Sequence, residues 1–136
     1  MLNRAVALIS SRFDIYHTSI FLLDETGQWA EYRAGTGEVN KHLLAQNFRV
    51  EVGSASIVGW CTAHSKPRIA HDVGQEVVYL EHPLLPGTRS EMALPLMARG
   101  RVIGALDVQS TEKGAFDEET VAVMQTMADQ IGVAID

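Results

Sequence analysis

The sequence predicts an α+β domain in which helices pack on an antiparallel β-sheet, and three observations lead to this fold class. Two largely apolar runs, residues 91–98 and 101–110, flank Arg99-Gly100, a dipeptide suited to a two-residue hairpin turn. Apolar residues recur at helical spacing at both ends of the chain. With 136 residues, of which 46% are apolar, the chain is long enough for one domain with a substantial core and too short for two.

The central hairpin has apolar residues on both of its faces. Strand alternation puts Met92 and Leu94 on one face and Ala93 on the other. We therefore expect layers on both sides of the sheet rather than one solvated face. Pro95 cannot donate a hydrogen bond to a sheet. The turn places it opposite Gly104 at a non-hydrogen-bonded position, so the next strand must be short, bulged or absent.

The first half of the chain contains two helical patterns and three extended ones. Residues 2–13 predict an amphipathic helix. Residues 18–23 and 29–34 are predicted to be the two strands of a hairpin, because turn-forming residues separate them. Residues 37–48 suit a short helix, and a short extended piece is expected in residues 48–53.

A helix and a long loop precede the central hairpin. Ser54 or Ser56 can cap the helix, which is expected to end near His64 because a proline follows. A short strand is expected in residues 67–73. Residues 74–89 have no clear period, and a connection of this length in a compact domain is usually a functional lid or binding loop.

A long helix is expected after the hairpin, with Asp117 as its N-cap. Its apolar stripe runs to the end of the sequence without a stop signal, and the first helix begins as abruptly. We therefore expect both helices to continue in a longer protein and to form a homodimer. The expected dimer interface consists of Leu2, Val6, Ile9, Met124, Met127, Ile131 and Ile135.

Composition narrows the class of function. The net charge of −6 argues against binding to nucleic acid or to anionic lipid. The single cysteine, Cys61, excludes an internal disulfide and fits a reducing compartment. No apolar segment is long enough for a secretory signal or a membrane span. We expect a cytoplasmic domain with no nucleic-acid partner and no membrane insertion.

Three motifs carry a resemblance to a known family: Ser56-Ile57-Val58-Gly59-Trp60, the run from Arg89 to Leu96, and Gly104-Ala105-Leu106-Asp107-Val108. Together with the order of the elements, they make the whole chain, residues 1–136, resemble a GAF domain. The resemblance implies a GAF/PAS-like central antiparallel sheet of five to six strands. It also implies terminal helices on one face of the sheet and a pocket with its lid on the other.

The GAF family is a sensor and dimerisation module of histidine kinases, cyclases, phosphodiesterases and regulators. The resemblance thus implies a single GAF-like domain from a longer multidomain signalling protein, such as a two-component histidine kinase or a nucleotide cyclase or phosphodiesterase. We expect the domain to bind a small molecule, to dimerise through its terminal helices and to relay the ligand state to an output domain. The alternative is a dimerisation spacer with no ligand.

The expected ligand site lies between the helix that ends at His64, the lid and the central hairpin. Small side chains on the hairpin leave space, while the lid supplies Tyr79 to stack on a ligand and His82 and Arg89 to donate hydrogen bonds. The expected ligand-binding residues are Ile57, Cys61, His64, Tyr79, His82, Arg89, Glu91, Ala93, Ala105 and Asp107.

Other ligand chemistries have weaker support. Asn40-Lys41 and Phe116-Asp117-Glu118 echo a cyclic-nucleotide signature of the family, but the three-residue spacer is absent. His82 could ligate haem, and Cys61 could sense redox state. No pair of histidines has the spacing of a zinc site, so no metal site is expected. The identity of the ligand or cofactor stays open.

Catalysis is the least expected function. One branch of the family reduces free methionine sulfoxide with several cysteines, and thiol–disulfide turnover needs a second thiol that this chain lacks. No nucleophile-elbow motif is present either. We therefore expect no catalytic residues and a domain that is not an enzyme by itself, although the parent protein could be one.

Overall fold

Six strands form one antiparallel sheet in the order β3-β2-β1-β6-β5-β4. The computed structural model describes residues 1–135, and the α+β fold with a sheet of five to six strands is confirmed. The elements in chain order are α1 (Leu2–Phe13), β1 (His17–Leu23), β2 (Trp29–Gly35), α2 (Val39–Ala45), β3 (Arg49–Glu51), α3 (Ile57–His64), β4 (Arg68–Ala70), the 3₁₀ turn η1 (Val73–Gln75), β5 (Ser90–Ala98), β6 (Arg101–Ser110) and α4 (Glu118–Ile135).

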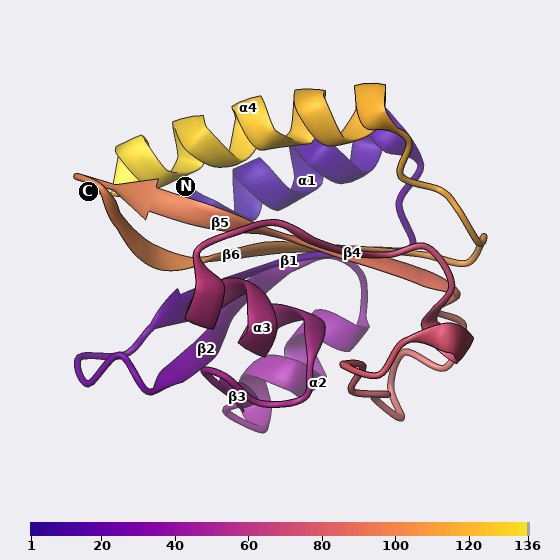
Figure 1. Cartoon of the computed structure of the whole chain (residues 1–136), viewed down its shortest axis with the longest axis horizontal. Helices are drawn as coiled ribbons and strands as arrows, with labels where there is room; N and C mark the ends of the chain where they lie inside the picture. The colour runs from indigo at the N-terminus through magenta and orange to yellow at the C-terminus, as the bar shows by residue number, and fades with distance from the viewer. Residues whose placement is uncertain (136) are drawn as a thin grey trace.

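The sheet separates two layers, as Figure 1 shows. Helices α1 and α4 lie side by side on one face, which we call the helix face. Helices α2 and α3 and the lid (residues 74–89) lie on the other face, which we call the cavity face. This is the expected arrangement, and it explains why the central hairpin needs apolar side chains on both sides.

The hairpin of β5 and β6 turns at Arg99-Gly100, as predicted, with both residues in the left-handed region (φ 52° and 76°). The predicted register of Pro95 was wrong. A bulge between Leu96 and Met97 shifts the pairing by one residue, so Pro95 lies opposite Ala105 instead of Gly104. Strand β4 pairs only as far as Ala93, so no β4 residue lies opposite the proline.

Two predicted helix caps are present. The Ser56 hydroxyl, rather than that of Ser54, accepts a hydrogen bond of 2.9 Å from the Gly59 amide and begins α3. The Asp117 carboxylate accepts one of 2.8 Å from the Thr120 amide and begins α4. Both caps satisfy amides that the helix cannot pair internally.

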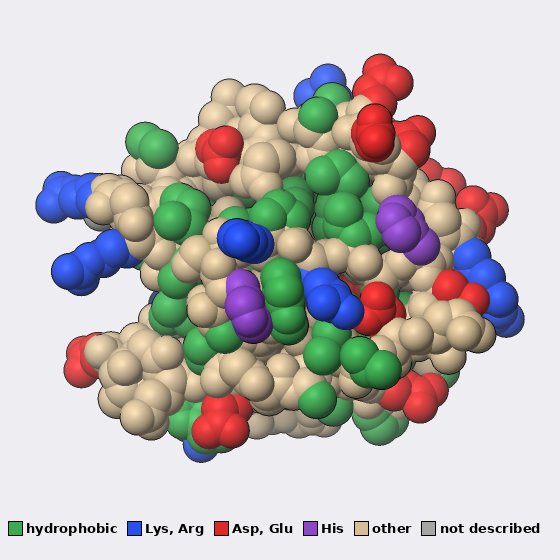
Figure 2. Space-filling model, viewed as in Figure 1, with side chains coloured by type: hydrophobic (Ala, Val, Ile, Leu, Met, Phe, Trp, Pro, Cys, Tyr) green, Lys and Arg blue, Asp and Glu red, His purple; other side chains and the backbone are tan. Residues whose placement is uncertain are grey.

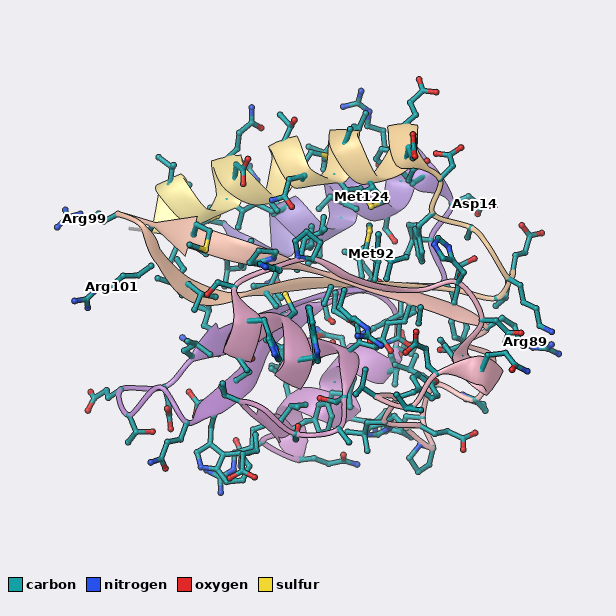
Figure 3. The ribbon with its side chains drawn as sticks, viewed as in Figure 1. Asp14, Arg89, Met92, Arg99, Arg101 and Met124 are labelled. Carbon is teal, nitrogen blue, oxygen red and sulfur yellow. The ribbon has the colours of Figure 1, made fainter. Side chains whose placement is uncertain are left out.

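The apolar stripes of the terminal helices face the protein's own sheet. Val6, Ile9, Met124 and Ile131 belong to the core on the helix face, and Leu2, Met127 and Ile135 pack against it half-buried. Figure 3 shows the Met92 and Met124 side chains in the layer between the sheet and α4. The sheet therefore covers Val6, Ile9, Met124 and Ile131, whereas Leu2, Met127 and Ile135 keep part of their surface exposed.

Helix α4 approaches the sheet closely at Gly132. A Cβ atom at this position would collide with the backbone of Met97 in β5, next to the bulge at which β6 has one extra residue, Ile103. The missing side chain therefore lets the helix backbone rest directly on the strand backbone.

Candidate functional site

A cavity with a volume of about 40 Å³ lies on the cavity face, between the sheet, the start of α3 and the lid. Aromatic rings form much of its wall. The Phe21 ring meets the Tyr32 ring edge-on at 5.5 Å between centroids, and the lid's His82 ring meets Phe48 at 4.9 Å. A mostly apolar cavity with a few polar groups in its wall is the composition that small-molecule sites have.

Two acidic side chains, Glu91 on β5 and Asp107 on β6, line this cavity. They are only 6% and 1% exposed. Burial raises the pKa of both carboxyl groups, because the charged form loses its hydration. The charge of Asp107 and a hydrogen bond between the two side chains raise the pKa of Glu91 further. The pair therefore holds protons more tightly than two free carboxyl groups would.

Gln109 connects this carboxyl pair to the lid. Its Nε2 donates to Oδ2 of Asp107 at 2.9 Å and approaches Oε2 of Glu91 at 3.5 Å. The hydroxyl of Thr88, at the end of the lid, donates to Oε1 of Gln109 at 2.6 Å. This second bond fixes the amide, so that its NH₂ group faces the carboxyl groups.

One oxygen of the pair has no partner. Oδ1 of Asp107 is excluded from solvent, and no described residue donates a hydrogen bond to it. Most buried carboxyl oxygens in proteins accept at least one hydrogen bond, and leaving one unpaired costs free energy. Asp107 therefore brings an unused acceptor to the cavity.

A second polar group, His17, lines the cavity from β1, where it is the cross-strand partner of Gln109. Nε2 of His17 lies 3.3 Å from the Tyr32 hydroxyl, which donates to Oδ1 of Asn40 at 3.0 Å. Burial lowers the pKa of His17 to about 4, against a weaker opposing effect of a hydrogen bond to the Thr36 backbone. His17 is therefore neutral at pH 7.

The structure brings four of the ten predicted ligand-binding residues to the cavity: Ile57, His82, Glu91 and Asp107. Tyr79 is half-buried on the lid beside them. Burial, and next the charge of Glu91, raise its pKa to about 12. These five residues remain candidates for ligand contact.

Cys61, Ala93 and Ala105 lie behind the cavity wall instead. All three are fully buried in the core beneath α3, so the small alanines accommodate the helix and leave no space for a ligand. The Cys61 side chain is fully shielded from solvent. Burial raises the pKa of its thiol to about 12, which disfavours the reactive thiolate.

His64 and Arg89 point away from the cavity. The His64 ring is exposed and stacks on Trp60 at 4.1 Å, on the outer side of α3. A histidine, an apolar side chain and basic side chains lie next to one another over this helix in Figure 2. Arg89 projects from the edge of the sheet (Figure 3). Neither residue lines the cavity.

Sequence reasoning missed several cavity residues, above all His17, Tyr32, Phe48 and Gln109. A signal for His17 existed: in β1 the polar His17 and Ser19 alternate with Thr18 and Ile20, so they share the face of Phe21. We have no comparable signal for Phe48, because it lies outside any strand or helix.

Two further findings concern metals and membranes. In the part of the chain that the structure describes, no three histidine, cysteine or acidic side chains gather as a metal site would require. None of the helices within residues 1–135 is both long and apolar enough to cross a membrane.

Solved structures share this fold over nearly the whole chain. The GAF domain of a phosphoenolpyruvate-protein phosphotransferase from Coxiella burnetii aligns with a TM-score of 0.85 at 21% identity, covering 96% of this chain and 77% of that one. The type II free methionine-R-sulfoxide reductase of Thermoplasma acidophilum aligns with a TM-score of 0.82 at 21% identity, covering 96% and 86%. Identities this low show a common fold only.

The prediction that this domain is not an enzyme by itself is corrected by these comparisons. The free methionine-R-sulfoxide reductase of Neisseria meningitidis, solved in complex with its substrate, also aligns, with a TM-score of 0.83 at 21% identity, covering 96% of this chain and 73% of that one. Reductases thus have this fold, so the fold gives no ground for excluding catalysis.

No curated protein is similar enough to this chain to count as a match. The sequence profile of the GAF domain family, by contrast, matches residues 1–136, the full length of the chain. The fold, the lid and the position of the cavity agree with that match. The chain belongs to the GAF domain family.

Proposed function

We propose that this GAF domain is a sensory domain that binds a small molecule in the cavity and relays the ligand state to an output domain in signal transduction. The observation that supports this most is the unpartnered, solvent-excluded Oδ1 of Asp107 in a mostly apolar cavity. An apolar side chain at this position would give a more stable core, because a buried carboxyl group loses its hydration. A binding role accounts for its presence.

The strands offer a direct route from the cavity to the terminal helices. Strand β5 presents Glu91 to the cavity and the next residue, Met92, to the core on the helix face. In β6, Asp107 and Leu106 are related in the same way. A ligand that shifts these strands must therefore repack the side chains that hold α4.

The homodimer remains part of the proposal, but with a partly different set of residues. On the outer surface of the terminal helices, Leu8 of α1 is 57% exposed and Val133 of α4 is 73% exposed. These side chains, with the exposed parts of Leu2, Met127 and Ile135, are available to a second copy of the chain. Leu8→Glu is expected to shift sedimentation toward the monomer without loss of folding. A wild-type domain that is monomeric at high concentration would contradict the dimer.

A thermal-shift screen against metabolites and nucleotides tests the ligand, because a ligand that binds only the folded state raises the melting temperature. Leu80 lines the cavity from the lid and is 49% exposed. Leu80→Trp should therefore block the entrance without straining the core, and it should abolish the shift. Val77→Trp is the matched control, since Val77 belongs to the same lid but is 86% exposed.

Two results would count against the proposed function. A ligand whose thermal shift survives Leu80→Trp binds at another site. A domain whose melting temperature no compound raises, while the dimer persists, would favour the alternative of a dimerisation spacer.

A further inference from the structure

The cavity contains acidic groups without a cation to balance them. Among the described residues, no lysine or arginine lines it, although Glu91 and Asp107 both do. Arg68 on the neighbouring β4 pairs with Glu76 at 2.6 Å. His17 is neutral at pH 7, as shown above, and burial also lowers the pKa of His82. A positive charge in this cavity must therefore come from a bound molecule.

Few hydrogen-bond donors face the oxygen atoms of the carboxyl pair. The Gln109 amide supplies two N–H groups, which are used on one oxygen each of Asp107 and Glu91. A proton shared between the two carboxyl groups reduces their charge, and no N–H or hydroxyl group of the described residues donates to Oδ1 of Asp107. The missing partner is thus a hydrogen-bond donor.

Aromatic rings line the same cavity as Asp107. Phe21, Tyr32 and Phe48 form a continuous set, with ring centroids 5.5 to 6.4 Å apart, and all three line the cavity. Faces of aromatic rings attract cations as well as apolar groups. An organic cation would therefore find both a charged acceptor and a favourable wall.

We propose that the ligand of this site is a small organic cation, such as a protonated amine or an amidine on an apolar or aromatic body. Its N–H group donates to Oδ1 of Asp107, with Glu91 as the second carboxyl group, and its body packs against Phe21 and Phe48. This assignment rests on the proposed function, because it names the chemical class of the ligand for the same cavity.

Matched probes that differ only in charge test the assignment. We would titrate the domain with 2-phenylethylamine and benzamidine, and with their neutral counterparts 2-phenylethanol and benzamide, at pH 7.5 by calorimetry. The cationic probes are expected to bind at least about tenfold more tightly than the neutral ones, as charge-assisted hydrogen bonds allow. Phenylacetate, the anionic counterpart, should not bind.

Substitutions test whether the cationic probes bind at the carboxyl pair. Asp107→Asn should reduce the affinity for the cationic probes by about tenfold or more and leave that for the neutral probes unchanged. Glu91→Gln provides a second test if Asp107→Asn does not fold. His64→Ala is the control, because His64 is exposed on the outer side of α3 and does not line the cavity.

The outcomes separate this inference from the proposed function. If neutral or anionic probes bind better than the cations, and Leu80→Trp blocks them, the cavity is a ligand site but the cationic assignment is wrong. Failure of both cationic probes to bind at millimolar concentration also overturns the assignment, whereas the wider metabolite screen still decides the proposed function.

Discussion

The two faces of the sheet are made by the same strands but differ in chemistry. On the helix face, Met92 and Leu106 belong to a core of buried apolar side chains. One residue away along each strand, Glu91 and Asp107 place carboxyl groups in the opposite layer. The helix face therefore contributes stability through apolar burial, whereas the cavity face retains groups whose burial costs free energy.

This difference shows that the domain keeps its stability and its binding chemistry on separate faces. Natural domains often lose stability where they carry function, because the groups that bind a ligand are imperfectly satisfied without it. If this holds here, deletions on the helix face should destabilise the protein, and removal of charge on the cavity face should not.

The largest effect is expected for Leu106→Ala on the helix face. Leu106 is fully buried, so the deletion should lower the free energy of unfolding by about 2–5 kcal/mol in urea titrations. Leu85→Ala is the same change in the lid and should cost only about 1–2 kcal/mol, because the lid can close over the gap. Equal losses of unfolding free energy for Leu106→Ala and Leu85→Ala would contradict the proposed difference between the two faces.

His17 should make the cavity face sensitive to acid. Its pKa is about 4 in the folded domain against about 6.5 in an unfolded chain, so the unfolded state alone binds a proton as the pH falls from 6.5. Stability should then decline by about 3 kcal/mol between pH 6.5 and pH 4. His17→Gln should remove this part of the decline. If stability declines as steeply in His17→Gln as in the wild type, groups other than His17 cause the decline.

Gly132→Ala tests how much the close contact between α4 and β5 contributes to the stability of the helix face. The added methyl group would collide with the Met97 backbone, so α4 must move away from the sheet. We expect a loss of about 1–3 kcal/mol in the free energy of unfolding. Val133→Ala, at the exposed neighbouring position, should change it by less than about 0.5 kcal/mol. Similar values for both variants would show that the close contact contributes little.

The smallest effect, and one of opposite sign, is expected for Asp107→Asn. The raised pKa of Asp107 means that the unfolded chain releases its proton first as the pH rises above about 3.9, which favours unfolding. Removing the charge should therefore stabilise the domain by about 1 kcal/mol at pH 7 and have no effect below pH 3.9. The exposed Glu25→Gln is the control, and a destabilised Asp107→Asn would contradict the account.

Much of the fold could be predicted from local patterns. The alternation along β5 and β6 and the turn at Arg99-Gly100 depend on strand geometry alone, and both are present in the structure. The register shift between Leu96 and Met97 could not be predicted, because neither of these residues is of a type that marks a bulge.

The candidate site was only partly predictable, because cavities depend on packing between distant segments. The small side chains of Ala93 and Ala105 suggested free space, but α3 fills it. His64 was assigned to the inner face of α3, yet its ring stacks on the outside. Tyr32 and Phe48 reach the cavity through tertiary packing that no local spacing reveals.

The backbone contact at Gly132 has a mechanical consequence. It lies near one end of α4, 14 residues from Glu118, which is about 21 Å along the helix axis. A tilt of about 5° around this contact would therefore displace the Glu118 end by about 2 Å. Such a tilt would make α4 a lever that turns about its contact with Met97 of β5, so a small movement of the strand would become a larger one at the far end of the helix.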